Sequence, residues 1–145
     1  MRKAINEVSI RRTLAAVCGA MLTCVWVSQG AVAAEWAQEP APTTTKAGWE
    51  LIDKHLAELD SQIQVGKIGS LGSAAYGIAN AFKAVAGLST TLPADQRAIV
   101  QGDVKVVGSE VSKLDKAGEH NDPAGVRSHL QALKETLTKD RAYYH

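Results

Sequence analysis

The sequence has few of the residues that build covalent or metal chemistry. Its 145 residues include two cysteines and two methionines, and all four lie within the first 24 positions. Beyond that point the chain can form no disulfide, thiolate metal site, cysteine nucleophile or covalent haem attachment. Methionine ligation of haem or of Cu(I) is excluded there for the same reason.

An excess of charge of one sign is also lacking. The chain carries 16 lysines and arginines against 15 aspartates and glutamates. Residues 1–34 hold four of the basic residues and one acid, so the remainder has 12 basic and 14 acidic residues and a net charge of −2. This balance argues against a nucleic-acid surface, which needs a basic face.

The N-terminus has the pattern of a secretory signal peptide. A basic start ends at Arg11-Arg12, an apolar run covers residues 13–27, and Ala31-Val32-Ala33-Ala34 supplies the small residues that a signal peptidase reads. We expect cleavage after residue 33 or 34, with export by general secretion or by the twin-arginine route. The alternative is an uncleaved anchor, because residues 13–34 are just long enough to cross a bilayer.

The rest of the chain has the pattern of helices. Residues 35–46 have no apolar period and are expected to form a flexible linker. Apolar residues then recur at steps of three and four in four segments, about 46–65, 68–88, 93–118 and 123–144. The predicted core positions are Trp49, Ile52, Leu56, Leu59 and Ile63; Leu71, Ala75, Ile78, Phe82 and Val85; Val100, Val104, Val107, Val111 and Leu114; and Val126, Leu130, Leu133, Leu137 and Tyr144. This pattern indicates an all-α fold: an antiparallel up-and-down four-helix bundle over residues 47–144, preceded by the signal peptide at 1–34.

Capping and turn residues mark the helix ends. Thr44 or Thr45 can cap the first helix, and Gly66-Lys67 suits a tight turn after it. Gly118 is expected just past the third helix, and Asp122-Pro123 to cap and start the fourth. The connections are therefore short.

The second helix has small residues at every fourth position, Gly69, Ser73, Gly77 and Ala81. Such a ridge lets another helix approach closely. We expect a helix of the same bundle to pack on it, and the alternative is a partner protein or a second copy of the chain.

Two of the four histidines are candidate metal ligands. His55 and His129 each precede a predicted core leucine, and in an antiparallel helix pair they would face each other near the same level. With Asp53 nearby they could hold Cu(II), Ni(II) or Zn(II). The alternative is that both are half-exposed surface residues, since the Glu-x-x-His pattern of di-metal bundles is lacking.

Nothing in the sequence indicates catalysis. No serine lies in a nucleophile-elbow pattern, no histidine has a recognisable orienting acid, and no phosphate-binding loop is present. Asp140 is the one acid at a stripe position, and we expect it near the edge of the core, paired with Arg141 or with water. Tyr144 is expected to join the core near Trp49.

The helix and turn pattern resembles that of small exported helical-bundle proteins of Gram-negative bacteria. The shared features are the signal peptide, a tryptophan-containing first helix with a Gly-Lys turn, Leu92-Pro93-Ala94 opening the third helix, residues 114–119 closing it, and a leucine-rich last helix ending in aromatic residues. The resemblance covers about residues 47–144 and implies a periplasmic location. Some proteins of this kind are encoded among heavy-metal efflux and resistance genes.

These observations lead us to expect a non-enzymatic periplasmic binding or accessory protein, linked to metal or envelope stress. It would need no cofactor and would act on a protein partner, as a monomer or homodimer, without nucleic acid or membrane. One alternative is a metal or haem carrier that uses His55 and His129. Another is a structural module that self-associates through its second helix.

Overall fold

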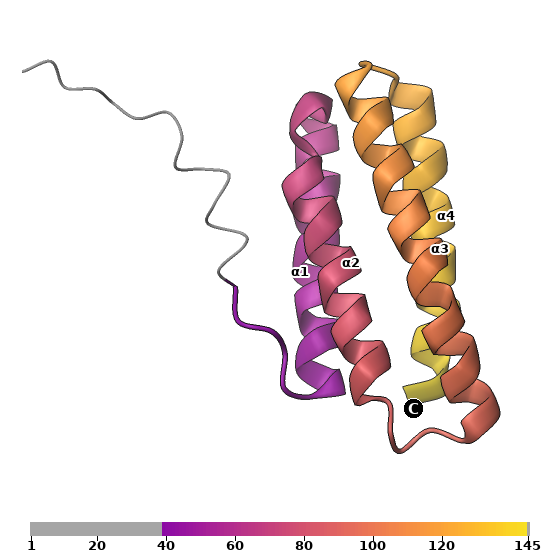
Figure 1. The fold of residues 1–145 in the computed structure, drawn as a ribbon. Helices are drawn as coiled ribbons and strands as arrows, with labels where there is room; N and C mark the ends of the chain where they lie inside the picture. Colours follow the sequence, from indigo (N-terminus) through magenta and orange to yellow (C-terminus); the bar gives the residue numbers. More distant parts are fainter. Residues whose placement is uncertain (1–38, 145) are drawn as a thin grey trace, which may run out of the picture.

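The computed structural model describes residues 39–144, which form four α-helices and two short 3-10 turns (Figure 1). The elements are α1 (Thr45–Gln64), η2 (Ile68–Ser70), α2 (Gly72–Leu88), α3 (Ala94–Glu119), α4 (Pro123–Arg141) and η3 (Ala142–Tyr144). No strand occurs between residues 39 and 144, so the predicted all-α fold is confirmed there. The predicted signal peptide, its cleavage site and both cysteines lie outside the described residues. Within them, no helix combines the length and apolar character that crossing a membrane requires.

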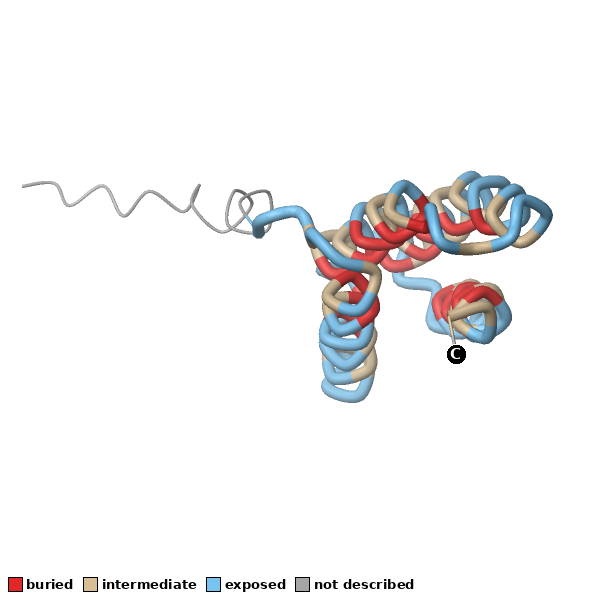
Figure 2. The backbone as a smooth tube through the Cα atoms, turned by 90° about the horizontal axis from the view of Figure 1, so that it is seen from below, coloured by how far each residue is buried: buried red, intermediate tan, exposed pale blue. Residues whose placement is uncertain are grey.

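Helices that follow one another along the chain lie side by side. α1 packs on α2, α2 on α3 and α3 on α4, and η2 lies against α3. Figure 1 shows α1 with α2 on one side of the molecule and α3 with α4 on the other. In Figure 2 the buried residues gather on the faces that the helices turn toward one another. The core is therefore shared by all four helices.

The core consists of the stripes that the sequence predicts. Every predicted core position is buried except Leu56, Ile63, Val104 and Tyr144, which are half-buried and pack against the core. Burying one side chain of this size contributes about 1.5–3 kcal/mol. Apolar burial along these stripes is therefore the main force that holds the helices together.

The predicted caps begin α1 and α4. Thr44 Oγ1 accepts a 3.1 Å hydrogen bond from the backbone N–H of Ala47. Asp122 Oδ1 accepts from the N–H groups of Ala124 and Gly125 at 3.1 and 3.0 Å, and a proline takes the first helical position. These bonds satisfy N–H groups that have no partner within the helix.

α1 ends in the tight turn at Gly66-Lys67 that the sequence predicts. Gly66 has a φ of 75°, and its N–H donates to the Ile63 carbonyl at 3.1 Å. The N–H of Lys67 donates to the Gln62 carbonyl at 2.8 Å. This pair of bonds is a Schellman motif, which glycine favours because it enters the left-handed region without a steric penalty.

The end of α3 uses the same motif with a different residue. Asn121 has a φ of 53°, and Asn121 and Asp122 donate to the carbonyls of Gly118 and Ala117 at 3.0 and 2.8 Å. The expectation that Gly118 follows the helix end is therefore wrong, since Gly118 lies inside α3. A Cβ at Gly118 would overlap the carbonyl oxygen of Ile68, so the missing side chain lets η2 approach α3.

The segment predicted as one helix over residues 68–88 is divided into η2 and α2. Gly69 and Gly72 lie at the division, and each glycine costs a helix interior up to about 1 kcal/mol relative to alanine. α2 has no side-chain cap, but a Cβ at Gly72 would lie 2.6 Å from Asp115 Oδ1 of α3. The Asp115 carboxylate thus lies at the positive end of the α2 dipole, where a negative charge is stabilising.

Candidate functional site

His55 is a buried residue on the α2 side of α1, with 5% of its surface exposed. Its ring lies against Gly77, where a Cβ would be 2.5 Å from His55 Nε2. Nε2 lies 3.3 Å from Glu39 Oε2, and Nδ1 lies 3.5 Å from Glu58 Oε2. The alternative that this histidine is a half-exposed surface residue is therefore wrong.

The described end of the predicted linker covers His55. Glu39 Oε1 accepts a 2.6 Å hydrogen bond from Lys54 Nζ, and this bond lowers the pKa of the Glu39 carboxyl. A hollow of about 130 Å³ lies between residues 39–42 and the helices, lined by His55 and Gly77 among others. Glu39 thus attaches this segment to α1.

His129 of α4 has a carboxylate partner on α3. Its Nδ1 lies 2.9 Å from Glu110 Oε2 of α3, and Glu110 Oε1 accepts a 2.6 Å hydrogen bond from Lys113 Nζ. The bond from Lys113 is the main cause that lowers the pKa of Glu110. His129 therefore contacts α3, whereas His55 contacts α2 and the preceding segment.

The predicted metal ligands thus belong to separate clusters. Between residues 39 and 144 no group of three or more histidine, aspartate or glutamate side chains is arranged to hold a metal ion. Asp53, which we expected near the histidines, instead forms an ion pair with Arg141. The two-histidine metal site stays a prediction.

The small-residue ridge of α2 faces α1 in its central part. Gly77 accommodates the His55 ring, and Ala81 is buried in the core. Gly69 lies outside α2, with nothing near enough to contact an added Cβ. The prediction that a helix of the same bundle packs on the ridge is therefore confirmed for its central part. Because α1 covers this part, less of the ridge is free to contact a second copy of the chain.

The burial and the partners of Asp140 differ from those that the sequence predicts. It has no exposed surface, and neither carboxylate oxygen has a hydrogen-bond partner among the described residues. Burial, and then the negative charge of Asp103, raise the pKa of Asp140 to about 6. The expected partner Arg141 instead donates to both carboxylate oxygens of Asp53, at 2.6 and 2.9 Å. The expectation of a satisfied acid at the core edge is therefore wrong.

The face between α1 and α4 is the least closed part of the described fold. These two helices do not pack along their length as the three sequential pairs do. Long side chains cross the space instead: Lys134 Nζ donates to both oxygens of Asp60 at 2.8 Å, and Arg141 reaches Asp53. Lys134 and Asp60 are each about two-fifths exposed, so the crossing is solvated.

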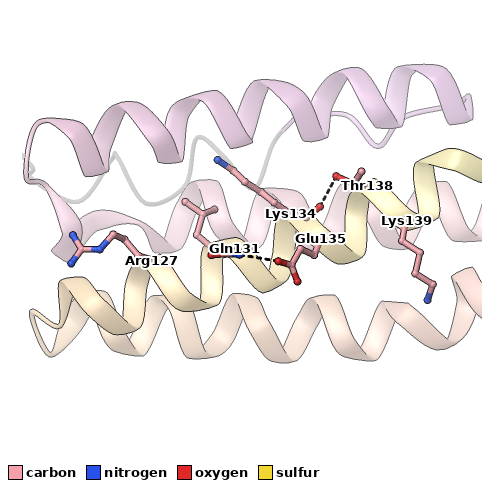
Figure 3. Close-up of a pocket in the computed structure, with 7 residues that line it drawn as sticks. Arg127, Gln131, Lys134, Glu135, Thr138 and Lys139 are labelled. Atoms are coloured by element: carbon pink, nitrogen blue, oxygen red, sulfur yellow. Dashed lines mark hydrogen bonds between the residues drawn. The ribbon is translucent and has the colours of Figure 1, made fainter.

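Two adjoining hollows lie along this face, and we call them together the α1–α4 groove. One has a volume of about 310 Å³ between the two helices, and the other has about 720 Å³ along α4. Lys134 and Thr138 line both. Figure 3 shows the side chains that project from α4 around the larger hollow, with Lys134 pointing toward the neighbouring helix.

The groove has an apolar floor and charged edges. The floor consists of Trp49, Ile52, Leu56, Leu130 and Leu137. The edge formed by α4 carries Arg127, Lys134, Lys139 and Arg141, together with the acid Glu135. Lys134, Lys139 and Arg141 are paired with Asp60, Asp103 and Asp53. Of the floor residues only Leu56 is half-buried, and the other four are buried, so the groove offers a shallow apolar surface beside charged side chains.

One end of the groove is closed by aromatic packing. The Arg141 guanidinium lies 5.0 Å from the centroid of the Trp49 ring, a cation–π contact. Tyr144 packs edge-on against the same ring at 5.6 Å between centroids, as the sequence predicted. The other end, at Arg127, has no such cover among its lining residues.

Sequence reasoning missed this groove, although a signal for it exists. Arg127, Lys134 and Arg141 are spaced by seven residues beside the leucine stripe of α4, and Asp53 and Asp60 have the same spacing on α1. Comparison with protein-family models, with curated proteins and with solved structures gives no match for this chain. Its functional interpretation therefore depends on the geometry of the groove itself.

Proposed function

We propose that this chain is an exported, non-enzymatic binding protein of the Gram-negative periplasm that holds its ligand in the α1–α4 groove. The signal-peptide pattern of residues 1–34 supports export. The resemblance to small exported bundle proteins supports the periplasm and an accessory role in metal or envelope stress.

The open α1–α4 face is the observation that carries the binding role. A four-helix fold gains stability by burying apolar surface, yet Leu56 stays half-buried at this face and is covered by side chains rather than by a helix. Exposed ion pairs such as Lys134–Asp60 contribute about 0–1 kcal/mol. A ligand that fills the groove can therefore displace them at low cost.

The cross-groove ion pairs also support the antiparallel up-and-down arrangement of the proposal. Asp53 pairs with Arg141 and Asp60 with Lys134, so the residue number rises along α1 as it falls along α4. The short connections favour the same topology.

Native mass spectrometry of the protein purified from periplasm tests this function. We expect a chain cut after residue 33 or 34 that carries an additional bound mass. Thr138→Trp fills the groove from its shared wall and should abolish the bound mass. Ser109→Trp, at an exposed position of α3, is the matched control and should keep it.

Two results would contradict the proposal. A bare chain without ligand or partner would remove the binding role, and a bound mass retained in Thr138→Trp would place the ligand elsewhere. A bound mass equal to a divalent metal or haem would favour the carrier that uses His55 and His129.

A further inference from the structure

Residues 39–42 lie along α1 before that helix begins, and we call them the N-terminal strap (Figure 1). Glu39 contacts Lys54, whereas the Pro42 ring lies beside Gly48, where a Cβ would be 3.6 Å from Pro42 Cγ. α1 rises about 9 Å between these two helix residues. Three residues of extended, polyproline-type chain span about the same distance. The strap therefore runs antiparallel to α1 in an extended conformation.

The sequence of the strap favours this conformation. The rings of Pro40 and Pro42 fix φ near about −65°. A residue that precedes proline is restricted to the extended region, which applies to Glu39 and Ala41. Little conformational freedom is therefore left to lose when the strap docks on the helix.

The Glu39 carboxylate lies between two nitrogen atoms of adjacent α1 residues. Lys54 Nζ donates to Oε1 at 2.6 Å, and His55 Nε2 lies 3.3 Å from Oε2. The His55 side chain is 6% exposed, and its ring packs against Gly77 of α2. The Glu58 carboxylate faces the other ring nitrogen, Nδ1, and so leaves the Nε2 side to Glu39. One of the two nitrogen atoms that face the carboxylate is therefore fixed in place by burial.

The strap does not fill the surface on which it lies. A hollow of about 130 Å³ separates it from the helices, which is more than the roughly 30 Å³ that one water molecule occupies. Ala41 lines this hollow from the strap, Leu51 and Ala81 add apolar surface, and Asn80 of α2 adds an amide. A segment with a larger side chain in place of Ala41 would gain contacts here.

We propose that this face of α1 and α2 is a docking site for an extended segment of a partner protein that carries a carboxylate followed by proline, and that the strap occupies it as an intramolecular ligand. The strap itself shows the chemistry that the site accepts. A partner segment must displace it, because both need Lys54 and His55. The site is independent of the α1–α4 groove, which involves another side of α1.

The proposal also explains how weak contacts keep the strap in place. The strap is joined to α1 by a short connection, so its effective concentration at the site is on the order of millimolar. A free segment of the same sequence has no such advantage. We therefore expect the site to have millimolar affinity for a peptide copy of the strap once the strap itself is released.

Peptide titration followed by NMR of the ¹⁵N-labelled protein tests the proposal. The probe is a capped peptide with the sequence of residues 37–43. Glu39→Gln combined with Pro42→Gly removes both anchors of the strap, and this double variant should bind the peptide at least tenfold more tightly than the natural protein does. The signals that shift should be those of α1 and α2 around His55. Glu119→Gln removes an exposed acid at the end of α3 and should leave the affinity within twofold of the natural value.

Three altered peptides test the parts of the ligand on the double variant. Glutamine in place of the peptide's glutamate should weaken binding at least fivefold, because Lys54 and His55 lose their partner. Alanine in place of both prolines should weaken it severalfold, because the extended conformation is no longer pre-organised. Leucine at the position equivalent to Ala41 should strengthen it severalfold, because the added methylenes enter the hollow.

The proposal is overturned if the natural protein and the double variant bind the peptide equally, or if the double variant binds the glutamate and glutamine peptides equally. Unchanged signals of Ala41 and Thr43 in the double variant would also overturn it, because Glu39 and Pro42 would then not anchor the strap. Thr138→Trp added to the double variant should leave peptide binding unchanged. Loss of binding there would place the peptide in the α1–α4 groove and overturn the separate site.

Discussion

The imidazole of His55 occupies the place where Gly77 has no side chain. The arrangement is reciprocal, because a Cβ at Gly48 of α1 would overlap Val85 of α2. One glycine on each helix thus lets α1 and α2 approach closely. This contact turns His55 toward α2 and leaves Asp53 on the side of α1 that faces α4.

Gly77→Ala should destabilise the protein, because its Cβ would lie 2.5 Å from the buried ring. Overpacking of this kind costs about 1–3 kcal/mol. Gly102→Ala is the control, since a Cβ there meets nothing within 4 Å and alanine favours the helix by up to about 1 kcal/mol. Urea unfolding of both variants measures the difference. Equal stabilities would contradict the contact, and His55→Ala should rescue Gly77→Ala if it is present.

Asp140→Asn should change the dependence of stability on pH. The native pKa of Asp140 is raised from 3.8 to about 6 by burial and by Asp103. The native carboxyl holds its proton more tightly than the unfolded one. The stabilising contribution of proton binding at Asp140 to the free energy of unfolding is therefore complete below about pH 4 and is lost as the pH rises through about 6. The stability of Asp140→Asn relative to the natural protein should therefore increase by up to about 3 kcal/mol between pH 4 and pH 7.

Denaturant unfolding at both pH values checks this prediction. Glu135→Gln, at an exposed position of the same helix, is the control and should shift stability by less than about 0.5 kcal/mol at either pH. A difference for Asp140→Asn that does not vary with pH would show that the buried carboxyl titrates normally.

Tyr144→Phe should loosen the C-terminal end. Ser89 Oγ donates to the Val85 carbonyl at 2.6 Å, so the Tyr144 hydroxyl donates its proton to Ser89 Oγ. Loss of this bond should lower the free energy of unfolding by about 1 kcal/mol. Tyr143→Phe is the matched control, because the Tyr143 hydroxyl has no hydrogen bond among the described residues, and thermal unfolding compares the two. An equal effect of both substitutions would argue against the bond.

Asn121→Ala should destabilise the turn between α3 and α4. Asn121 has a φ of 53°, a conformation that costs most L-residues about 1–2 kcal/mol. Asn121→Gly removes the same side chain without that penalty and should be at least as stable as the natural protein. Thermal melting of the pair provides the test, and equal melting temperatures would mean that the turn relaxes to another conformation.

Helix positions and ends could be predicted because their causes are local. Thr44, Gly66 and Asp122 act on backbone groups within a few residues. The apolar stripes repeat with the helical period, which determines the face that is buried. Gly118 was misassigned because its role, to admit the Ile68 carbonyl, depends on a contact with residues far away in the sequence.

The partners of charged residues could not be predicted in this way. Asp140 and Arg141 are neighbours in the sequence but point about 100° apart on a helix with 3.6 residues per turn. One is buried, and the other reaches across to Asp53 of α1. Each partner therefore depends on which helix lies beside that face.

The sequence by itself determined that the described chain is all helical, where α1 and α4 begin, where α1 ends, which faces form the core, and that cysteine and methionine chemistry is excluded beyond residue 24. Only the tertiary structure decided that His55 and His129 contact different carboxylates, that Asp140 is buried without a partner, and that α1 and α4 leave a groove. The physical reason is that periodicity and capping act within a few residues. Helix separation depends instead on residues far apart in the sequence, such as His55 and the glycine at position 77 against which its ring packs, that meet only after the chain has folded.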